Sequence, residues 1–214
     1  MGKENSTGYI YIVLIKALTG LGKFVRKLTG YEYTHIAVSF DDSLTDFVTF
    51  SRRNHYAALD AGIMHECRSC YAYGDIEEFK TKVFKLPVAT ERLENIRKIV
   101  HELEADKDYM FNLFSMVTMP ILKGFRVYKA HNCMSFVGLI IKESDSIEME
   151  KPYYKYSIPE VDDLLEDYLF FDGNLKTDHI VLENYMLKPK FTDRAKISIG
   201  TIFKLLGRVF KKAG

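Results

Sequence analysis

Residues 34–51 read THIAVSFDDSLTDFVTFS, and this stretch decides the class of fold. Two runs rich in β-branched and aromatic residues, 34–40 and 47–51, stand on either side of a short acidic turn. Such a pattern is typical of two antiparallel strands joined as a hairpin. The chain is therefore expected to build an antiparallel sheet around this hairpin.

Further strands are expected on both sides of the hairpin. Residues 9–15 (YIYIVLI) form a continuous apolar run, which is typical of a strand buried on both faces. Two more strands are expected at 63–67 and 81–86, and Pro87 is expected to end the second.

The second half of the chain changes to helical spacing of its apolar residues. Helices are predicted over residues 17–30, 90–105, 132–142, 159–165 and 197–212, and an apolar stretch at 109–119 is expected to end at Pro120. Thr90 and Asn132 are the expected N-caps of two of these helices. Because most strands precede most helices, the order predicts an α+β fold.

Length and composition indicate an ordinary globular chain with one main domain. The sequence has 214 residues, of which 47% are hydrophobic and 28% charged. We expect a disordered N-terminus at 1–8, a domain at 9–190 and a C-terminal amphipathic helix at 191–214. The net charge is +1 and no basic stripe with interleaved aromatic residues is present, which argues against nucleic-acid binding.

Cysteine usage and the N-terminal sequence predict a cytoplasmic protein. Three cysteines are too few for a disulfide scaffold, and the N-terminus lacks the apolar segment of a secretion signal. The segments 17–28 and 197–212 are basic and amphipathic, so they could also rest on an anionic membrane surface.

A cysteine at the start of a predicted helix is the main candidate for chemistry. Cys133 follows the polar pair His131 and Asn132. A thiol attacks as its thiolate, and the unpaired N–H groups and dipole of a helix N-terminus favour that negative charge. The same N–H groups could hold an oxyanion. The alternative is a small buried residue on an apolar helix.

His35 is the candidate base for this nucleophile. It lies in an otherwise apolar strand, which is a rigid support for a base that must reach a nucleophile. His131 is a rival base, although it lies too close to Cys133 in the sequence to swing easily to its sulfur.

A third residue usually orients such a base. Thr49 and Ser51 share one face of the strand expected beside His35, and Glu66 on the next strand is a charged alternative. The sequence leaves these three residues open.

His65, Cys67 and Cys70 form an H-x-C-x-x-C pattern of metal-ligand residue types. A structural zinc needs four ligands and no fourth is evident nearby, so no metal is expected. The two cysteines could instead form a redox pair, but nothing around them resembles a thioredoxin βαβ unit.

Several segments together resemble the circularly permuted papain-fold proteins of the NlpC-like superfamily, which are related to lecithin:retinol acyltransferase. The matching segments are YIYIVLI, the basic helix after it, YTHIAVSF, FVTFSRR and HNCMSFVGLIIKES. The likeness covers roughly residues 9–170, and its most specific elements are Asn-Cys-x-x-Phe-Val and the Thr-His strand. In that superfamily the histidine strand precedes the cysteine helix.

The resemblance implies a papain-like fold in permuted order, with an antiparallel sheet or small barrel packed against helices. It also implies Cys133 as nucleophile, His35 as base and a polar residue at the place of Thr49 or Ser51. Proteins of this superfamily cleave amide or ester bonds or transfer acyl chains. The acyltransferases carry a second histidine as the third residue, and none lies at 47–51 here, which favours hydrolysis.

The expected function is therefore that of a cysteine-dependent hydrolase or acyltransferase that needs no cofactor. Its substrate would be a lipid acyl ester or a peptide, and a membrane surface is a second expected partner. The alternative is a non-catalytic lipid-binding module on the same fold.

Overall fold

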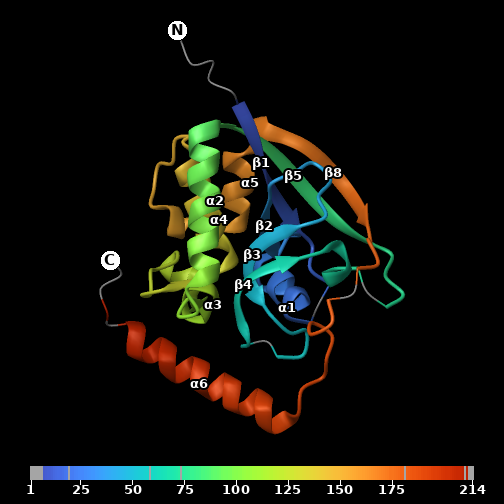
Figure 1. Cartoon of the computed structure of the whole chain (residues 1–214), viewed down its shortest axis with the longest axis vertical. Helices are drawn as coiled ribbons and strands as arrows, with labels where there is room; N and C mark the ends of the chain where they lie inside the picture. Colours follow the sequence, from blue (N-terminus) through green and yellow to red (C-terminus); the bar gives the residue numbers. More distant parts are fainter. Residues whose placement is uncertain are drawn as a thin grey trace.

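The computed structural model of the chain describes residues 7–18, 20–57, 59–72, 74–180, 182–209 and 211. Its centre is a six-stranded antiparallel sheet in the order β4-β3-β2-β1-β5-β8 (Figure 1). The strands are β1 Thr7–Ile15, β2 His35–Ser39, β3 Phe47–Arg52, β4 Ala61–Glu66, β5 Glu78–Ala89 and β8 Leu169–Lys176. The expected hairpin is confirmed, because β2 and β3 pair in antiparallel fashion.

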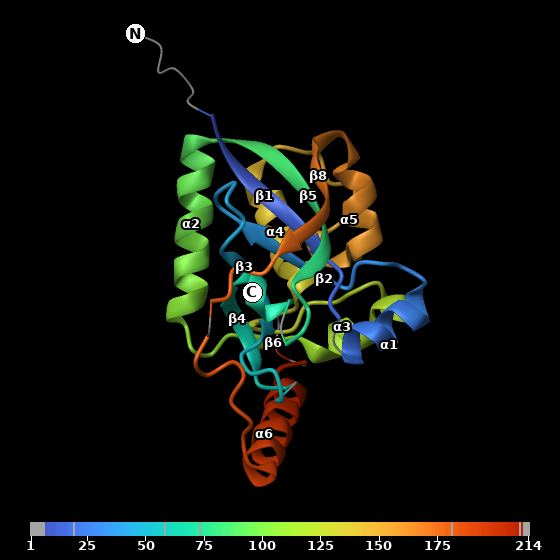
Figure 2. The ribbon, with the colours of Figure 1, turned by 90° about the vertical axis from the view of Figure 1, so that its right-hand side faces the viewer.

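Helices accompany this sheet, so the fold is α+β as predicted. They are α1 Gly20–Thr29, α2 Thr90–Ala105, α3 Leu113–Leu122, α4 Cys133–Ser144, α5 Ile158–Leu164 and α6 Phe191–Val209. Helices α2, α4 and α5 lie along one side of the sheet in Figure 1, and α4 packs against β2 and β3. Figure 2 shows α2 and α5 on opposite sides of this layer and α6 below the rest of the molecule.

Strand β1 is apolar throughout because both of its faces are covered. Ile10 and Ile12 belong to the core cluster that includes residues of α2 and α4. Tyr11 and Val13 belong to a second cluster, which period-two alternation places on the opposite face. The continuous run of apolar residues thus follows from the central position of β1 in the sheet.

Short elements complete the sheet side of the molecule. A 3-10 turn, η1, spans Arg68–Cys70 directly after β4. Strands β6 Met110–Phe111 and β7 Ala130–His131 pair in parallel and lead into α3 and α4, respectively.

The strands differ from the prediction at two places. Strand β8 was not predicted, and β5 does not end at Pro87, which pairs with Tyr9 of β1. Strand β8 accompanies β5 only as far as Phe84. At Pro87 that edge of β5 therefore needs no N–H donor, and the strand tolerates a proline.

Two expectations about the helices are also wrong. Thr90 is the first residue of α2 and not its cap; Ala89 is the N-cap and makes no side-chain bond. Helix α3 does not end before Pro120 but continues to Leu122. The cap of α3 is Asn112, whose side chain accepts a hydrogen bond from the Ser115 N–H.

The ends of the chain are placed only in part. Residues 1–6 lie outside the described residues, whereas Thr7 and Gly8, expected to be disordered, begin β1. Helix α1 forms, but the apolar side chains at 21, 24, 25 and 28 lie outside the described part of the chain. In the described segments no helix is long and apolar enough to cross a bilayer.

Candidate functional site

The N-terminus of α4 is fixed by a capping box, and its N-cap is Asn132, as predicted. Asn132 is the N-cap, and its side chain accepts a hydrogen bond of 2.8 Å from the Ser135 N–H. Ser135 Oγ in turn accepts a 3.0 Å bond from the Asn132 N–H. These reciprocal bonds hold the turn whose first helical residue is Cys133.

The cap leaves donors at the end of the helix. The N–H of Ser135 is taken by the cap and that of Phe136 bonds to the Asn132 carbonyl at 3.0 Å. The N–H groups of Cys133 and Met134 belong to the first turn, where a helix supplies no acceptor. Asn132 is fully buried, and its Nδ2 has no hydrogen-bond partner within the described residues. The first turn of α4 and its cap therefore leave hydrogen-bond donors next to Cys133 in the sequence, of the kind that binds an oxyanion.

His35 is the first residue of β2, and its ring interacts with Glu66 and with Cys133. Its Nε2 is 3.0 Å from Oε2 of Glu66, the last residue of β4. The Cys133 side chain acts on the same ring through a hydrogen bond and through charge. The side chains of His35 and Glu66 are 12% and 3% exposed, so water screens this pair weakly.

The positive charge of His35 and the negative charge of Glu66 stabilise each other. Burial alone lowers the pKa of His35, but the carboxylate of Glu66 and the interactions with Cys133 outweigh it and raise that pKa from 6.5 to about 10. For Glu66, burial raises the pKa, but the positive charge of His35 and the hydrogen bonds that Glu66 accepts lower it overall. At neutral pH His35 is therefore an imidazolium beside a carboxylate.

Of the three alternatives that the sequence left open, Glu66 is the residue whose side chain bonds to the His35 ring. Its Oε1 accepts a 2.6 Å hydrogen bond from Ser51 Oγ. Its Oε2, the oxygen next to His35, also accepts a hydrogen bond from the Tyr71 hydroxyl. Ser51 thus reaches the site through Glu66, and Tyr71 is a residue that the sequence did not indicate.

Thr49 is not brought to His35. Its hydroxyl donates a 2.8 Å hydrogen bond to the carbonyl of Ile36. This bond ties β3 to β2 in the buried interior, so Thr49 has a structural role here. Glu66 was the better candidate for the partner of His35, because a carboxylate that becomes buried needs charged or hydrogen-bonding partners.

The rival base, His131, has a different environment. Its Nδ1 lies 3.2 Å from Ser135 Oγ, and its ring stacks on Tyr109 with a centroid separation of 5.9 Å. Burial, and then the positive charge of Arg126, lower the pKa of His131 to about 4. His131 is therefore a neutral ring and a weak proton acceptor at neutral pH.

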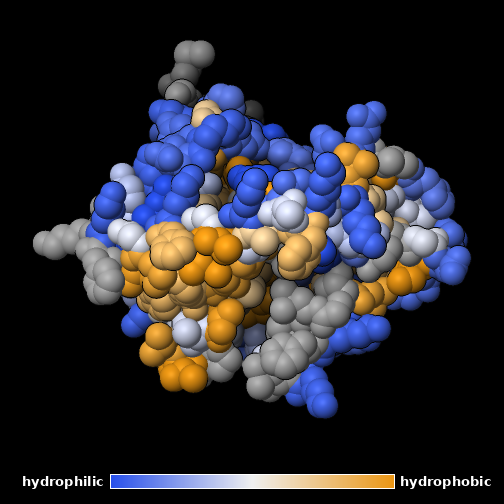
Figure 3. Space-filling model, turned by 90° about the horizontal axis from the view of Figure 1, so that it is seen from below, coloured by the Kyte–Doolittle hydropathy of each residue, from blue (hydrophilic) through white to orange (hydrophobic). Residues whose placement is uncertain are grey.

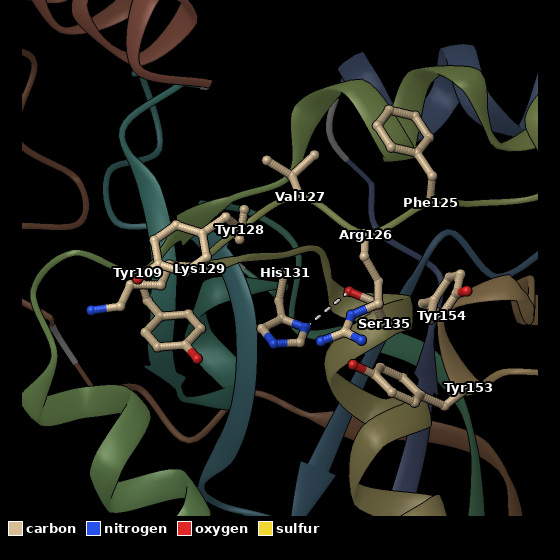
Figure 4. A pocket seen from close by; sticks show the side chains of 11 residues that line it. Tyr109, Phe125, Arg126, Val127, Tyr128, Lys129, His131, Ser135, Tyr153 and Tyr154 are labelled. Carbon is tan, nitrogen blue, oxygen red and sulfur yellow. Dashed lines mark hydrogen bonds between the residues drawn. The ribbon is translucent and has the colours of Figure 1, made fainter. Parts of the chain in front are cut away.

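A pocket of about 150 Å³ lies beside the N-terminus of α4, on the side of His131. Figure 4 shows Arg126 and Tyr153 near Ser135, with His131 bonded to the same serine. Cys133 does not line this pocket. The pocket therefore offers a positively charged space next to the cysteine helix rather than around the thiol.

The described part of the chain contains no group of three or more His, Cys, Asp or Glu residues that could hold a metal ion. His65 contacts Asp46 at 2.9 Å and Glu104 at 2.5 Å. Cys67 and Cys70 face each other with their sulfurs 3.8 Å apart.

No family model, curated protein or solved structure matches this chain. Its function must therefore be argued from the site itself.

Proposed function

We propose that this chain is a cysteine-dependent acyl hydrolase or acyltransferase of the permuted papain-like type. The observation that supports this most is that the His35 ring interacts both with the Cys133 side chain and with the carboxylate of Glu66. A nucleophile, a base and a residue that orients the base are the parts that covalent acyl chemistry needs.

In the proposed mechanism Cys133 attacks the carbonyl carbon of the substrate as a thiolate. The oxyanion that forms is stabilised by the N–H groups of Cys133 and Met134. His35 gives its proton to the leaving group as the carbon–oxygen or carbon–nitrogen bond breaks, which leaves a thioester on Cys133. A water or an acceptor alcohol then attacks the thioester while His35 takes its proton. The acyl group leaves, and the Cys133 thiolate and the His35 imidazolium are restored.

The proposed fold type follows from chain order. The histidine strand β2 precedes the cysteine helix α4, and α4 packs against β2 and β3. The three described cysteines are free and buried. We therefore place the protein in a reducing compartment, with the cytoplasm as the simplest choice.

A lipid acyl ester is the substrate class that the surface favours over a peptide. Figure 3 shows a broad apolar area on the lower face, the face that carries α6. Exposed apolar side chains of α6 and α3 include Phe191, Ile199, Phe203, Leu206, Val117 and Ile121. Lys196 and Lys204 add positive charge along α6. Such a surface suits the interface of an anionic membrane, from which an acylated lipid could be drawn.

The same surface would serve a non-catalytic lipid-binding module, which is the second candidate function. Trapping an acyl adduct separates the two. The protein is incubated with aryl esters of short and long fatty acids, with acylated peptide amides as a second probe. An adduct is then sought on Cys133 by peptide mass mapping.

We expect an acyl adduct on Cys133 in the native chain, slower formation in His35→Ala, and none at this position in Cys133→Ala. Peptide mass mapping assigns any adduct on Cys67 or Cys70 separately, so those thiols do not count toward this result. Binding of the long-chain ester without any adduct would leave only the lipid-binding function.

A further inference from the structure

A pair of thiols follows Glu66 directly in the sequence. Cys67 and Cys70 stand at the two ends of the turn η1, and their Sγ atoms are 3.8 Å apart. Both line a pocket of about 300 Å³, together with Ser69, His179 and Leu182. The thiols are thus close enough to react with each other and adjoin a space that a small molecule can enter.

The two thiols differ in how readily they ionise. The hydrogen bond with Cys70 lowers the pKa of Cys67 by more than burial raises it. The same hydrogen bond, burial and the charge of Glu66 raise the pKa of Cys70. Cys67 is therefore the thiol that becomes nucleophilic, and Cys70 is the one that keeps its proton.

We propose that Cys67 and Cys70 form a redox-active dithiol. Hydrogen peroxide oxidises it to a disulfide, and this disulfide weakens the contact between Glu66 and His35. In the first step the Cys67 thiolate attacks a peroxide oxygen, the O–O bond breaks, and the leaving hydroxide takes up a proton to give water. Cys67 is now a sulfenic acid. Cys70 then attacks the Cys67 sulfur, loses its proton, and releases the second water. The two thiols lose two electrons and two protons, and the peroxide is reduced to water.

The dithiol is joined to the first site by a short stretch of chain. The importance of this link rests on the proposed function of that site. Glu66 directly precedes Cys67, and Tyr71 directly follows Cys70. Tyr71 donates to Oε2 of Glu66, the oxygen that also contacts His35. A disulfide requires the sulfurs to approach from 3.8 Å to about 2.05 Å, and we expect the turn between Glu66 and Tyr71 to contract as they do.

The outer side of the turn is held in place, which directs the movement inward. Asp178 accepts hydrogen bonds from the N–H groups of Arg68 and Ser69, at 3.0 and 3.1 Å, and a further bond of 2.6 Å from Ser69 Oγ. Contraction of the turn is therefore transmitted to its two ends, where Glu66 and Tyr71 lie. Oxidation also removes the 3.8 Å contact in which Cys67 Sγ donates to the Ile180 carbonyl.

The test uses the full chain with Cys133→Ala, so that Cys67 and Cys70 are its only thiols during oxidation by hydrogen peroxide. We expect a mass decrease equal to two hydrogen atoms and a peptide linked through Cys67 and Cys70, both reversed by a dithiol reductant. The matched variant adds Cys70→Ser and should stop at a sulfenic acid on Cys67, which a cyclic 1,3-dione traps. No linked peptide, or equal trapping with and without Cys70, would overturn the proposal.

The coupling is measured on the same protein from the imidazole NMR signals of His35. Oxidation should lower the His35 pKa, by about one unit or more if the contact with Glu66 is lost. A disulfide that forms while the His35 pKa stays unchanged would overturn the coupling. Failure of the acyl chemistry cannot imitate either result, because this variant lacks Cys133 and neither measurement uses a substrate.

Discussion

Glu66 is a carboxylate in a place where an unpaired charge would be very costly. It is 3% exposed, and it is stabilised by His35 and by hydrogen bonds from Ser51 and Tyr71. Buried charges persist only when such partners are supplied. Glu66 is thereby kept ionised, and its charge keeps the ring of His35 protonated.

Substituting Glu66→Gln tests this at the level of one residue. The folded-state pKa of His35 is raised to about 10, so the imidazolium persists at neutral pH and is lost as the pH rises through that value. Without the carboxylate, burial dominates and the His35 pKa should fall, which moves this loss to lower pH. The measurement is an NMR titration of the His35 ring.

The matched control is Asp145→Asn, which removes a carboxylate at the far end of α4. Asp145 is exposed, pairs with Arg92 and adopts a left-handed conformation that asparagine tolerates. The Asp145→Asn variant should leave the pKa of His35 unchanged. Equal shifts in both variants would mean that net charge, and not the contact with Glu66, sets the pKa.

The residues of the site differ in how far the sequence could reveal them. Cys133 and Asn132 were predicted because a helix cap is a local pattern within a few residues. Glu66 remained one of three alternatives, because its contact with His35 depends on how β3 and β4 pair, with Phe47 opposite Glu66. Tyr71 was not found, because it reaches Glu66 only through the turn η1, which no sequence pattern indicated.

At the level of elements, α6 leaves much of its apolar surface uncovered. Leu205 is buried against the domain, whereas Phe203 is 70% and Ile199 56% exposed. A helix that buries Leu205 and leaves large apolar side chains exposed is suited to contact with another apolar surface. We propose that this surface is the membrane interface.

The variant Ile199→Glu/Phe203→Glu should weaken binding to vesicles of phosphatidylglycerol and phosphatidylcholine. Burial of one such side chain contributes about 1.5–3 kcal/mol, so a loss of about tenfold or more is expected in a sedimentation assay. Leu169→Glu on β8 is the control, because Leu169 is 50% exposed but lies on another element. Equal binding of both variants would exclude α6 as the membrane contact.

At the level of the whole molecule, the site exists only because three distant segments meet. Strands β2 and β4 and helix α4 supply His35, Glu66 and Cys133, and they are separated in the sequence by other elements. The sequence predicted the α+β class, the hairpin and the start of α4 from local periodicity and capping. It could not predict the sheet order or strand β8, because these depend on pairing between segments far apart in the chain.

The central claim is that His35 activates Cys133, and the rate of Cys133 alkylation by iodoacetamide at neutral pH tests it most directly. Peptide mass mapping separates Cys133 from Cys67 and Cys70. The imidazolium stabilises a neighbouring thiolate, so His35→Ala should slow alkylation by about tenfold or more. His131→Gln, which changes the other nearby histidine, should leave the rate close to that of the native chain. A purely steric role of His35 would give a faster reaction in His35→Ala, and an unchanged or faster rate in that variant would contradict the account.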